Sequence, residues 1–530
     1  MRLSLPVILM LVPMLRVGTL TRNALRSKTV KLGRRAPCGQ ISSSMNMIDE
    51  EQQHICHECV GNGFLKKEIR TEGNLKRCLY CEKIRKSVKL SWFSDRIHSA
   101  IEEHFYLTST GPSYYEQALL KDKELDYTWV RSGDPVNTLI QEIAGVDEAI
   151  TTDVQEYLSE SYGYPAVKDG EEDPYGDDAY YEECSPDVYN FQESWDFFCH
   201  EIKYRARYFG YAAEEILDGF FSDLDSLRTF DGRPVIRTAG PDREIHIIFR
   251  ARVSQSQDTL DKILKNPVRE LGTPLPKSAK NGRMNAAGIS VFYGSTDVKT
   301  CIAEVRSPVG SHVVVGRFHI IREVHLLDFD ALKSIYVKGS YFDPNYDNRR
   351  GHAAFLEHLV SELEKPVMPD DETFEYLPTQ VVAEYLAEKA KPRLDGILFG
   401  SSQTEDGGQN VVLFNHSCRV EPYNGGSVIS IDYGRGMDED YDDSITILEQ
   451  TPSTDQDHDD SEEETRTDHN DSEEEIGFEP IMRIEEETEF DAWPDNREFT
   501  LRLYVADIEV MVIEGVEYKT HERYTSRLRV

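Results

Sequence analysis

The stretch GRMNAAGISVFYGSTDVKTCIAEVR, residues 282–306, carries the pattern that decides the fold in the middle of the chain. Its apolar run at 289–293 contains β-branched and aromatic residues, which favour a short β-strand. Gly282 and Gly288 stand on either side of Arg283, and glycine gives a loop the backbone freedom for close approach to a ligand. The stretch therefore predicts a glycine-containing loop that leads into a strand.

Short apolar runs of the same kind lie on both sides of this stretch. They occupy residues 246–253, 311–318 and 396–399, and turns containing Gly or Pro separate them. This alternation predicts an α+β domain built on a mixed sheet. Near the end of the chain, residues 498–513 alternate in the same way and predict one or two further strands.

The composition limits the class of protein. The 530 residues include 59 Lys+Arg and 96 Asp+Glu, for a formal net charge of −37. Phosphate contact needs clustered Lys and Arg, so we expect no general nucleic-acid binding. No apolar run reaches the roughly 18 residues of a membrane span, so we expect no membrane partner either. Nine Cys in a chain of this length are too few for a disulfide scaffold.

The charge is unevenly spread along the chain. Residues 438–489 hold 23 acidic and two basic residues, which leaves 21 net negative charges. Like charges at this density repel each other, which predicts a disordered spacer over 436–490; an acidic interaction arm is the alternative. Residues 1–48 contain eight basic residues and no acidic ones, and we expect a disordered leader. A misassigned start, with Met45 or Met47 as the true first residue, is favoured over a signal or transit peptide.

A quartet of cysteines is the strongest local motif. Cys56 and Cys59 form one C-x2-C pair, Cys78 and Cys81 form a second, and 18 residues separate the pairs. Each pair can place two thiolates on one turn, and four sulfurs satisfy tetrahedral Zn²⁺; a redox dithiol is the alternative. Because four Cys ligands leave no open position for water, the expected zinc is structural. Paired free thiolates suit a reducing compartment, so we expect a cytoplasmic protein.

Helical spacing dominates the region that follows the cysteines. From residue 83 to about residue 162, apolar residues recur three or four positions apart, and helical pattern returns over 189–221. Between these regions, residues 164–187 are rich in Pro, Gly and acidic residues and predict a linker. We therefore expect a mainly α-helical domain with a four-cysteine zinc knuckle over 49–220.

Four blocks in a fixed order resemble the RES domain, a family named for an Arg, a Glu and a Ser. The blocks are FRAR at 249–252, GRMN leading to FY at 282–293, TCIAEVR at 300–306, and YLPTQ followed by DGILFGSS at 376–402. The resemblance covers residues 243–420 and implies an ADP-ribosyltransferase-like fold with NAD⁺ as substrate. Some RES proteins carry an N-terminal HEPN-type domain that opens with such a cysteine quartet, and residues 49–220 are similar to it. That region lacks the R-x4–6-H pair of catalytic HEPN domains, so it is expected to be structural or regulatory.

The resemblance implies an enzyme that breaks down NAD⁺ and releases nicotinamide, with a toxin-like effect. Such a reaction passes through an oxocarbenium-like transition state, and Glu304 matches the position of a carboxylate that could stabilise it. Tyr293 matches an aromatic position suited to stacking on nicotinamide or ribose. Ser401 matches the family serine, which would hydrogen-bond the nicotinamide ribose or amide, and Ser402 is its immediate rival.

The resemblance also implies which residues bind the substrate. Guanidinium groups bind phosphate oxygens in a bidentate manner, and Arg250 and Arg283 match the positions that would hold the pyrophosphate. Arg252 shares a face with Arg250 if this segment is a strand, and is a lesser candidate. Met284 stands where the family often has Trp, so the choice of water or phosphate as acceptor stays open.

Two other functions are compatible with these features. An ADP-ribosyltransferase would use the same residues to modify a macromolecule, and a catalytically inactive RES fold would serve as a binding module recruited through the zinc domain. An antitoxin or another protein is a further expected partner. Residues 491–530 are expected to form a short β-rich C-terminal segment.

Overall fold

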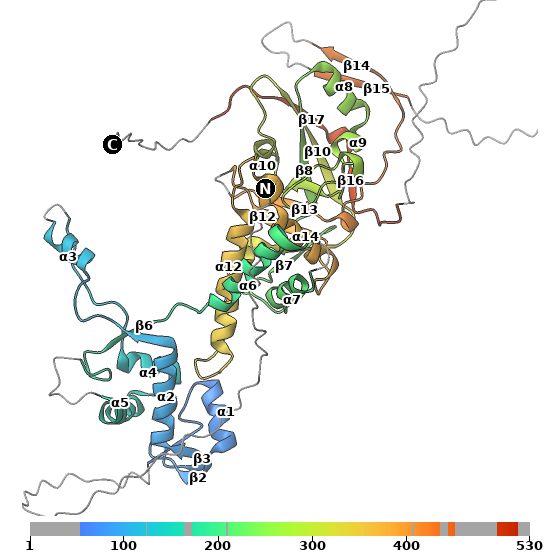
Figure 1. Ribbon diagram of the computed structural model, residues 1–530. Helices are drawn as coiled ribbons and strands as arrows, with labels where there is room; N and C mark the ends of the chain where they lie inside the picture. The colour runs from blue at the N-terminus through green and yellow to red at the C-terminus, as the bar shows by residue number, and fades with distance from the viewer. Residues whose placement is uncertain are drawn as a thin grey trace, which may run out of the picture. The chain divides into compact units, whose positions relative to one another are not determined.

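The computed structural model describes most of the chain beyond its first 52 residues (Figure 1). The described residues are 53–122, 125–163, 172–207, 210–404, 407–434, 444–450 and 495–517. The predicted basic leader and most of the predicted acidic spacer lie outside these ranges. Among the helices that the structure describes, none combines the length and the apolar character needed to cross a membrane.

The cysteine pairs lie in a small antiparallel sheet with the strand order β1-β3-β2. Its strands are β1 (His54–Cys56), β2 (Asn74–Arg77) and β3 (Ile84–Lys89). The second cysteine pair occupies the turn between β2 and β3. The prediction of helix from residue 83 onward is therefore wrong for residues 84–89. This segment pairs with a strand on each side, and those pairings satisfy its backbone groups.

Three of the expected helices follow this sheet: α2 (Leu90–His104), α4 (Val136–Ala144) and α5 (Glu148–Tyr162). A helix that was not predicted from the sequence, α1 (Gly63–Glu72), lies between β1 and β2 and shares one hydrophobic core with them. A shorter helix, α3 (Tyr114–Lys121), lies outside this core. Leu65, Ile97, Ile140 and Val154 are fully buried where the four helices meet. The apolar spacing of three and four residues accounts for this shared face.

The predicted linker at 164–187 is only partly supported. Residues 164–171 lie outside the described part of the chain, whereas 172–187 are folded onto the helical core. Tyr175 is 1% exposed, and its hydroxyl lies 2.5 Å from His98 Nδ1. Next along the chain, β6 (Tyr180–Glu183) pairs with β4 (Phe105–Leu107) and β5 (Asp134–Pro135). The linker prediction is wrong for 172–187, because its aromatic residues find partners among the helices that precede it.

The second half of the chain is organised around a nine-stranded sheet. Its order is β16-β10-β8-β9-β13-β12-β11-β7, and β17 also pairs with β10. The strands are β7 (Ile236–Ala239), β8 (Ile247–Ser254), β9 (Phe292–Ser295), β10 (His312–Ile320), β11 (Val324–Asp328), β12 (Gly396–Gly400), β13 (Gln409–Leu413), β16 (Leu501–Leu503) and β17 (Glu509–Val512). Strands β11 and β12 are parallel and the other pairs are antiparallel. The sheet is therefore mixed, and the predicted fold class is confirmed.

Helices cover both faces of this sheet because successive strand residues point to opposite sides. Ile397 and Val412 pack into the core formed with α6, α7, α12 and α14, whereas Leu398 and Leu413 pack towards α8 and α9. The bounds are α6 (Tyr189–His200), α7 (Tyr211–Phe220), α8 (Gln257–Lys265), α9 (Pro267–Leu271), α12 (Tyr346–Glu364) and α14 (Leu377–Glu388). A short helix, α10 (Val298–Glu304), follows β9 directly. The prediction of helix over 189–221 is confirmed by α6 and α7.

The C-terminal part contributes strands to the main sheet. The predicted strands at 498–513 are present as β16 and β17, and both pair with β10. They extend the main sheet at β10. A further hairpin pairs β14 (Val428–Gly434) with β15 (Ser444–Glu449). Residues 444–449 lie within the predicted disordered spacer, so that prediction is wrong for them; their alternating isoleucines pack towards the sheet.

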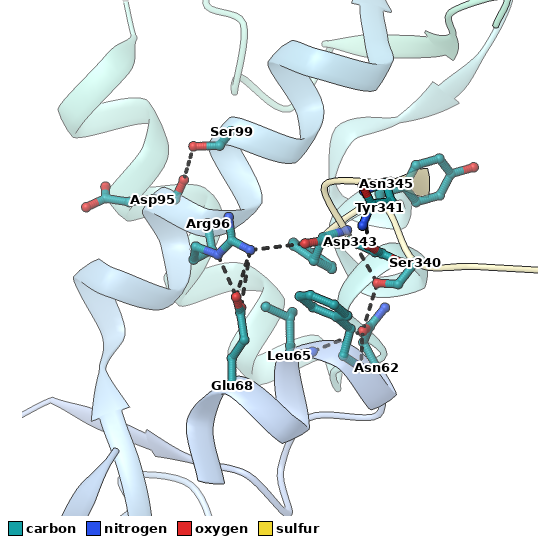
Figure 2. A network of polar contacts seen from close by, with 12 residues as sticks. Asn62, Leu65, Glu68, Asp95, Arg96, Ser99, Ser340, Tyr341, Asp343 and Asn345 are labelled. Carbon is teal, nitrogen blue, oxygen red and sulfur yellow. Dashed lines mark hydrogen bonds and ion pairs between the residues drawn. The ribbon is translucent and has the colours of Figure 1, made fainter. Parts of the chain in front are cut away.

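A loop before α12 reaches into the core of the N-terminal helices (Figure 2). Phe342 is 3% exposed and belongs to that core. Arg96 Nη2 donates to the Phe342 carbonyl at 3.2 Å, and Ser340 Oγ donates to Asn62 Oδ1 at 3.1 Å. Arg96 also forms an ion pair with Glu68 at 3.1 Å. These contacts join α12 to the zinc-knuckle region at one end of the helix.

Candidate active site and metal centre

The six predicted active-site residues line one cavity of about 610 Å³. The cavity lies beside β8, β9, β12 and β13, at the end of α10. The predicted residues in its wall are Glu304, Tyr293, Ser401, Arg250, Arg252 and Arg283. The fold therefore brings together side chains from positions 250 to 401.

The Glu304 carboxylate is held by two donors from other elements. Ser401 Oγ donates to Glu304 Oε1 at 2.6 Å, and Asn410 Nδ2 donates to the same oxygen at 2.7 Å. Asn410 is in turn fixed by Ser295 Oγ, which donates to its Oδ1 at 2.7 Å. Asp297 caps the N-terminus of α10 by accepting from the Thr300 backbone N–H. Glu304 itself remains solvent-exposed, so one carboxylate oxygen is oriented while the group stays accessible.

The two rival serines differ in their contacts. Ser401 follows β12 directly, and its Oγ also accepts from the Gln403 backbone N–H at 3.1 Å. Ser402 Oγ accepts from the Gln403 side chain at 3.2 Å. Both serines line the cavity, and Ser401 is the one that contacts Glu304. The structure thus distinguishes the two serines by their contact with the Glu304 carboxylate.

Arg250 is a buried cation without a compensating charge beside it. Its residue is 5% exposed, and its guanidinium carbon lies 4.7 Å from the centre of the Phe292 ring. Among the described residues, Nε and Nη1 of Arg250 have no hydrogen-bond partner. Burial, and then the charge of Arg252, lower the pKa of Arg250 to about 9. Such a group is costly unless paired, so an anionic ligand in the cavity would satisfy it.

The other two predicted arginines already have partners. Arg252 follows Arg250 by two residues on β8, and its Nε donates to the Glu270 carbonyl at 3.2 Å. Burial also lowers the pKa of Arg252. Arg283 Nη1 donates to the Leu363 carbonyl at 2.6 Å, and its guanidinium lies over the ring of Tyr376. These contacts fix both guanidinium groups in the cavity wall.

Tyr293 anchors the loop that contains Arg283. Its hydroxyl donates to Asn285 Oδ1 at 2.9 Å and accepts from the Met284 backbone N–H at 3.1 Å. Burial raises the pKa of Tyr293 to about 12, so the phenol stays neutral at physiological pH. A Cβ on Gly282 would lie 2.8 Å from the Tyr293 hydroxyl, too close for any side chain. The predicted glycine-dependent loop is therefore present.

Some residues in the cavity wall were missed by sequence reasoning. Asn410 is the most informative, because it touches Glu304 directly; its only signal was an isolated buried amide in the apolar strand β13. Lys333 and Glu364 form an ion pair at 2.6 Å in the same wall. Burial raises the pKa of Glu364. These two residues belong to separate helical segments and carried no pattern that could have joined them.

The four cysteines of the quartet lie together, as predicted. Their Sγ atoms all lie within 4.8 Å of one another, and three of the separations are 3.6–3.7 Å. Tetrahedral zinc with Zn–S bonds of about 2.3 Å requires sulfur–sulfur distances of roughly 3.8 Å. The arrangement therefore fits a metal ion bound by Cys56, Cys59, Cys78 and Cys81.

A comparison with known protein families supports the predicted resemblance in the middle of the chain. Residues 252–427, a third of the chain, match the family model of the RES domain. Arg252 is the first matched residue and Arg250 precedes the match, so both remain candidates for the arginine of the family. No curated protein sequence matches the chain.

Proposed function

We propose that this protein consumes NAD⁺ by cleaving the N-glycosidic bond to nicotinamide, as a glycohydrolase or phosphorylase with a toxin-like effect. The observation that supports this most strongly is the Glu304 carboxylate, fixed by Ser401 and Asn410 in a cavity whose wall also contains four arginines. A RES domain is associated with NAD⁺-related activity, which supports NAD⁺ as the substrate.

Glu304 has the chemistry that such a reaction needs. When the bond between the ribose C1′ and the nicotinamide nitrogen breaks, its electron pair leaves with nicotinamide and positive charge develops on the ribose. A carboxylate fixed beside the ribose stabilises that charge more in the transition state than in the ground state. The two hydrogen bonds to Oε1 hold the carboxylate in place before the reaction, so little reorganisation is required.

The acceptor of the ADP-ribosyl group, water or inorganic phosphate, supplies the atom that bonds to C1′. With water, the hydroxyl group joins C1′ to give ADP-ribose, and one proton is released. With inorganic phosphate, a phosphate oxygen joins C1′ instead. No redox step is involved in either case.

The remaining cavity residues would bind and orient the dinucleotide. Arg250 offers partnerless nitrogens to an anionic group, and Arg283 and Arg252 add positive charge to the same wall. Tyr293 stays protonated and holds the Arg283 loop through Asn285 and Met284, so its role would combine positioning with aromatic contact to the substrate.

The metal site has a different role in this proposal. Zinc bound by Cys56, Cys59, Cys78 and Cys81 would link β1 to the β2–β3 turn and stabilise the N-terminal fold. The likeness of that region to a HEPN-type domain stays a prediction, as do a cytoplasmic location and an antitoxin partner.

The proposal is tested with the full-length protein and NAD⁺ labelled in its adenine ring. We expect free nicotinamide together with labelled ADP-ribose, or ADP-ribose phosphate when phosphate is supplied. Stable label on a macromolecule would identify an ADP-ribosyltransferase instead. NAD⁺ that binds but remains intact would identify a binding module.

A further inference from the structure

Arg306 adopts a backbone conformation that is unfavourable for its residue type. It directly follows the C-terminal end of α10, and its φ is 47°, in the left-handed region. Glycine is the usual residue at this position after a helix, because a Cβ is strained there. The other described non-glycine residues with positive φ are Glu82, Asp223 and Asp242. Arg306 is thus the one basic residue among the described residues that is held in this conformation.

The side chain of Arg306 lies in the wall of the candidate active site. It is exposed and stands two residues after Glu304, on the same turn of chain. Its backbone N–H is fixed by a bond to the Ala303 carbonyl at 3.2 Å. Within the described part of the chain, its guanidinium forms no hydrogen bond or ion pair. A strained residue with an unused cation at a ligand cavity points to a role in binding.

The other arginines of the cavity are buried or already donate to backbone atoms. Arg250 is buried, whereas Arg252 and Arg283 each donate to a backbone carbonyl. Arg306 is the one arginine of this wall that is both exposed and, among described residues, without a partner. A dinucleotide places its two negative phosphates between its nucleosides, on a group that extends away from the reacting ribose.

We propose that Arg306 binds the diphosphate of the dinucleotide on the exposed side of the cavity, and that this contact is the reason for a strained arginine where glycine would fold more easily. The inference rests on the proposed function, since it takes NAD⁺ as the substrate. A bidentate guanidinium contact suits phosphate oxygens, and Lys cannot reproduce its planar geometry.

The test is to replace Arg306 in the full-length protein and to measure inhibition by two ligands. ADP-ribose contains the diphosphate and nicotinamide does not. For Arg306→Gly and Arg306→Lys we expect the inhibition constant of ADP-ribose to rise, by about tenfold for the glycine variant, while that of nicotinamide stays unchanged. Arg306→Gly should not lower the Tm, because it relieves the left-handed strain. Arg269→Ala, an exposed arginine on α9 outside the cavity, is the matched control.

Two results would overturn the inference. One is an unchanged inhibition constant for ADP-ribose in Arg306→Gly. The other is an equal rise for both ligands together with a lower Tm, which would indicate a structural role. A third result would instead contradict the proposed function. It is a wild-type protein that releases no nicotinamide and does not bind ADP-ribose in direct calorimetry, and it can be told apart from the two results above because those are seen only in the Arg306 variants.

Discussion

Asn410 is an uncharged residue that orients the carboxylate of Glu304. Its amide links Ser295 to Glu304 through two hydrogen bonds of 2.7 Å, so the carboxylate is oriented by strand β13 as well as by its own helix. The contact was not predictable from the sequence, because an asparagine within an apolar strand has no characteristic spacing. The pairing of β13 with β9 is what places it there.

Removing that amide should lower activity more than stability. For Asn410→Ala we expect kcat for nicotinamide release to fall roughly ten- to hundredfold, because Glu304 loses a donor that fixes it. The free energy of unfolding should fall by only about 1–3 kcal/mol, for the buried polar partners left unpaired. Steady-state kinetics and denaturant unfolding measure the two effects. Asn190→Ala, at an exposed position on α6, should change neither.

Arg250 leads to a prediction about anion binding. Burial disfavours its charge, but an arginine guanidinium stays protonated at neutral pH, so the protein holds a buried cation whose Nε and Nη1 have no hydrogen-bond partner among the described residues. An anion bound beside it would relieve the cost of that burial. For Arg250→Gln we therefore expect ADP-ribose to bind about tenfold more weakly or worse, measured by calorimetry at neutral pH. Unchanged affinity in that variant would contradict the assignment.

At the level of elements, the alternation along the strands explains which parts of the fold were predictable. The runs at 246–253, 311–318 and 396–399 correspond to β8, β10 and β12. These strands were predictable because the local pattern of apolar residues indicates which side of the sheet each residue faces. Residues 84–89 and 172–187 were misread, since their structure depends on partners distant in sequence. Glu304 and Ser401 were assigned to one site only through resemblance to a family, and their direct contact was not predicted. The resemblance did not include Asn410, Lys333 or Glu364.

The C-terminal strands provide a test of how the main sheet is built. Leu501 is fully buried in the core beneath the sheet, although 87 residues separate β16 from β13, the previous strand of that sheet. Leu501→Ala should reduce the free energy of unfolding by about 2–5 kcal/mol, through lost burial and the cavity that remains. Leu448→Ala, at a leucine on β15 that is 53% exposed, should have an effect within about 1 kcal/mol. Equal effects in chemical denaturation would show that β16 does not pack as described.

Across the whole molecule, the metal centre and the cavity are built from different parts of the chain. The quartet lies between residues 56 and 81, whereas the residues in the cavity wall come from positions 250 to 410. Phe342 and Ser340 are among the contacts that join these regions, by way of the loop before α12 (Figure 2). The metal is therefore expected to support the fold and to take no part in the chemistry.

This separation predicts distinct effects of metal loss. Cys78→Ser should reduce bound zinc, measured by elemental analysis, and lower the Tm of the N-terminal region, because three sulfurs hold the ion less tightly. Nicotinamide release by protein that remains folded should persist at a similar rate. Cys199→Ser, at a half-buried cysteine outside the quartet, should keep its metal. Retention of full zinc by Cys78→Ser would contradict the four-thiolate site.

Glu304 is proposed to act on the glycosidic bond of NAD⁺, and its carboxylate is tested by comparing three proteins. The rate of nicotinamide release is measured for the wild-type protein, for Glu304→Gln, and for Glu357→Gln, which alters an exposed carboxylate on α12 outside the cavity. We expect release by the wild type and by Glu357→Gln at similar rates, and a loss of at least about a hundredfold for Glu304→Gln, because the developing positive charge loses its carboxylate. Release by Glu304→Gln at the wild-type rate would contradict the account.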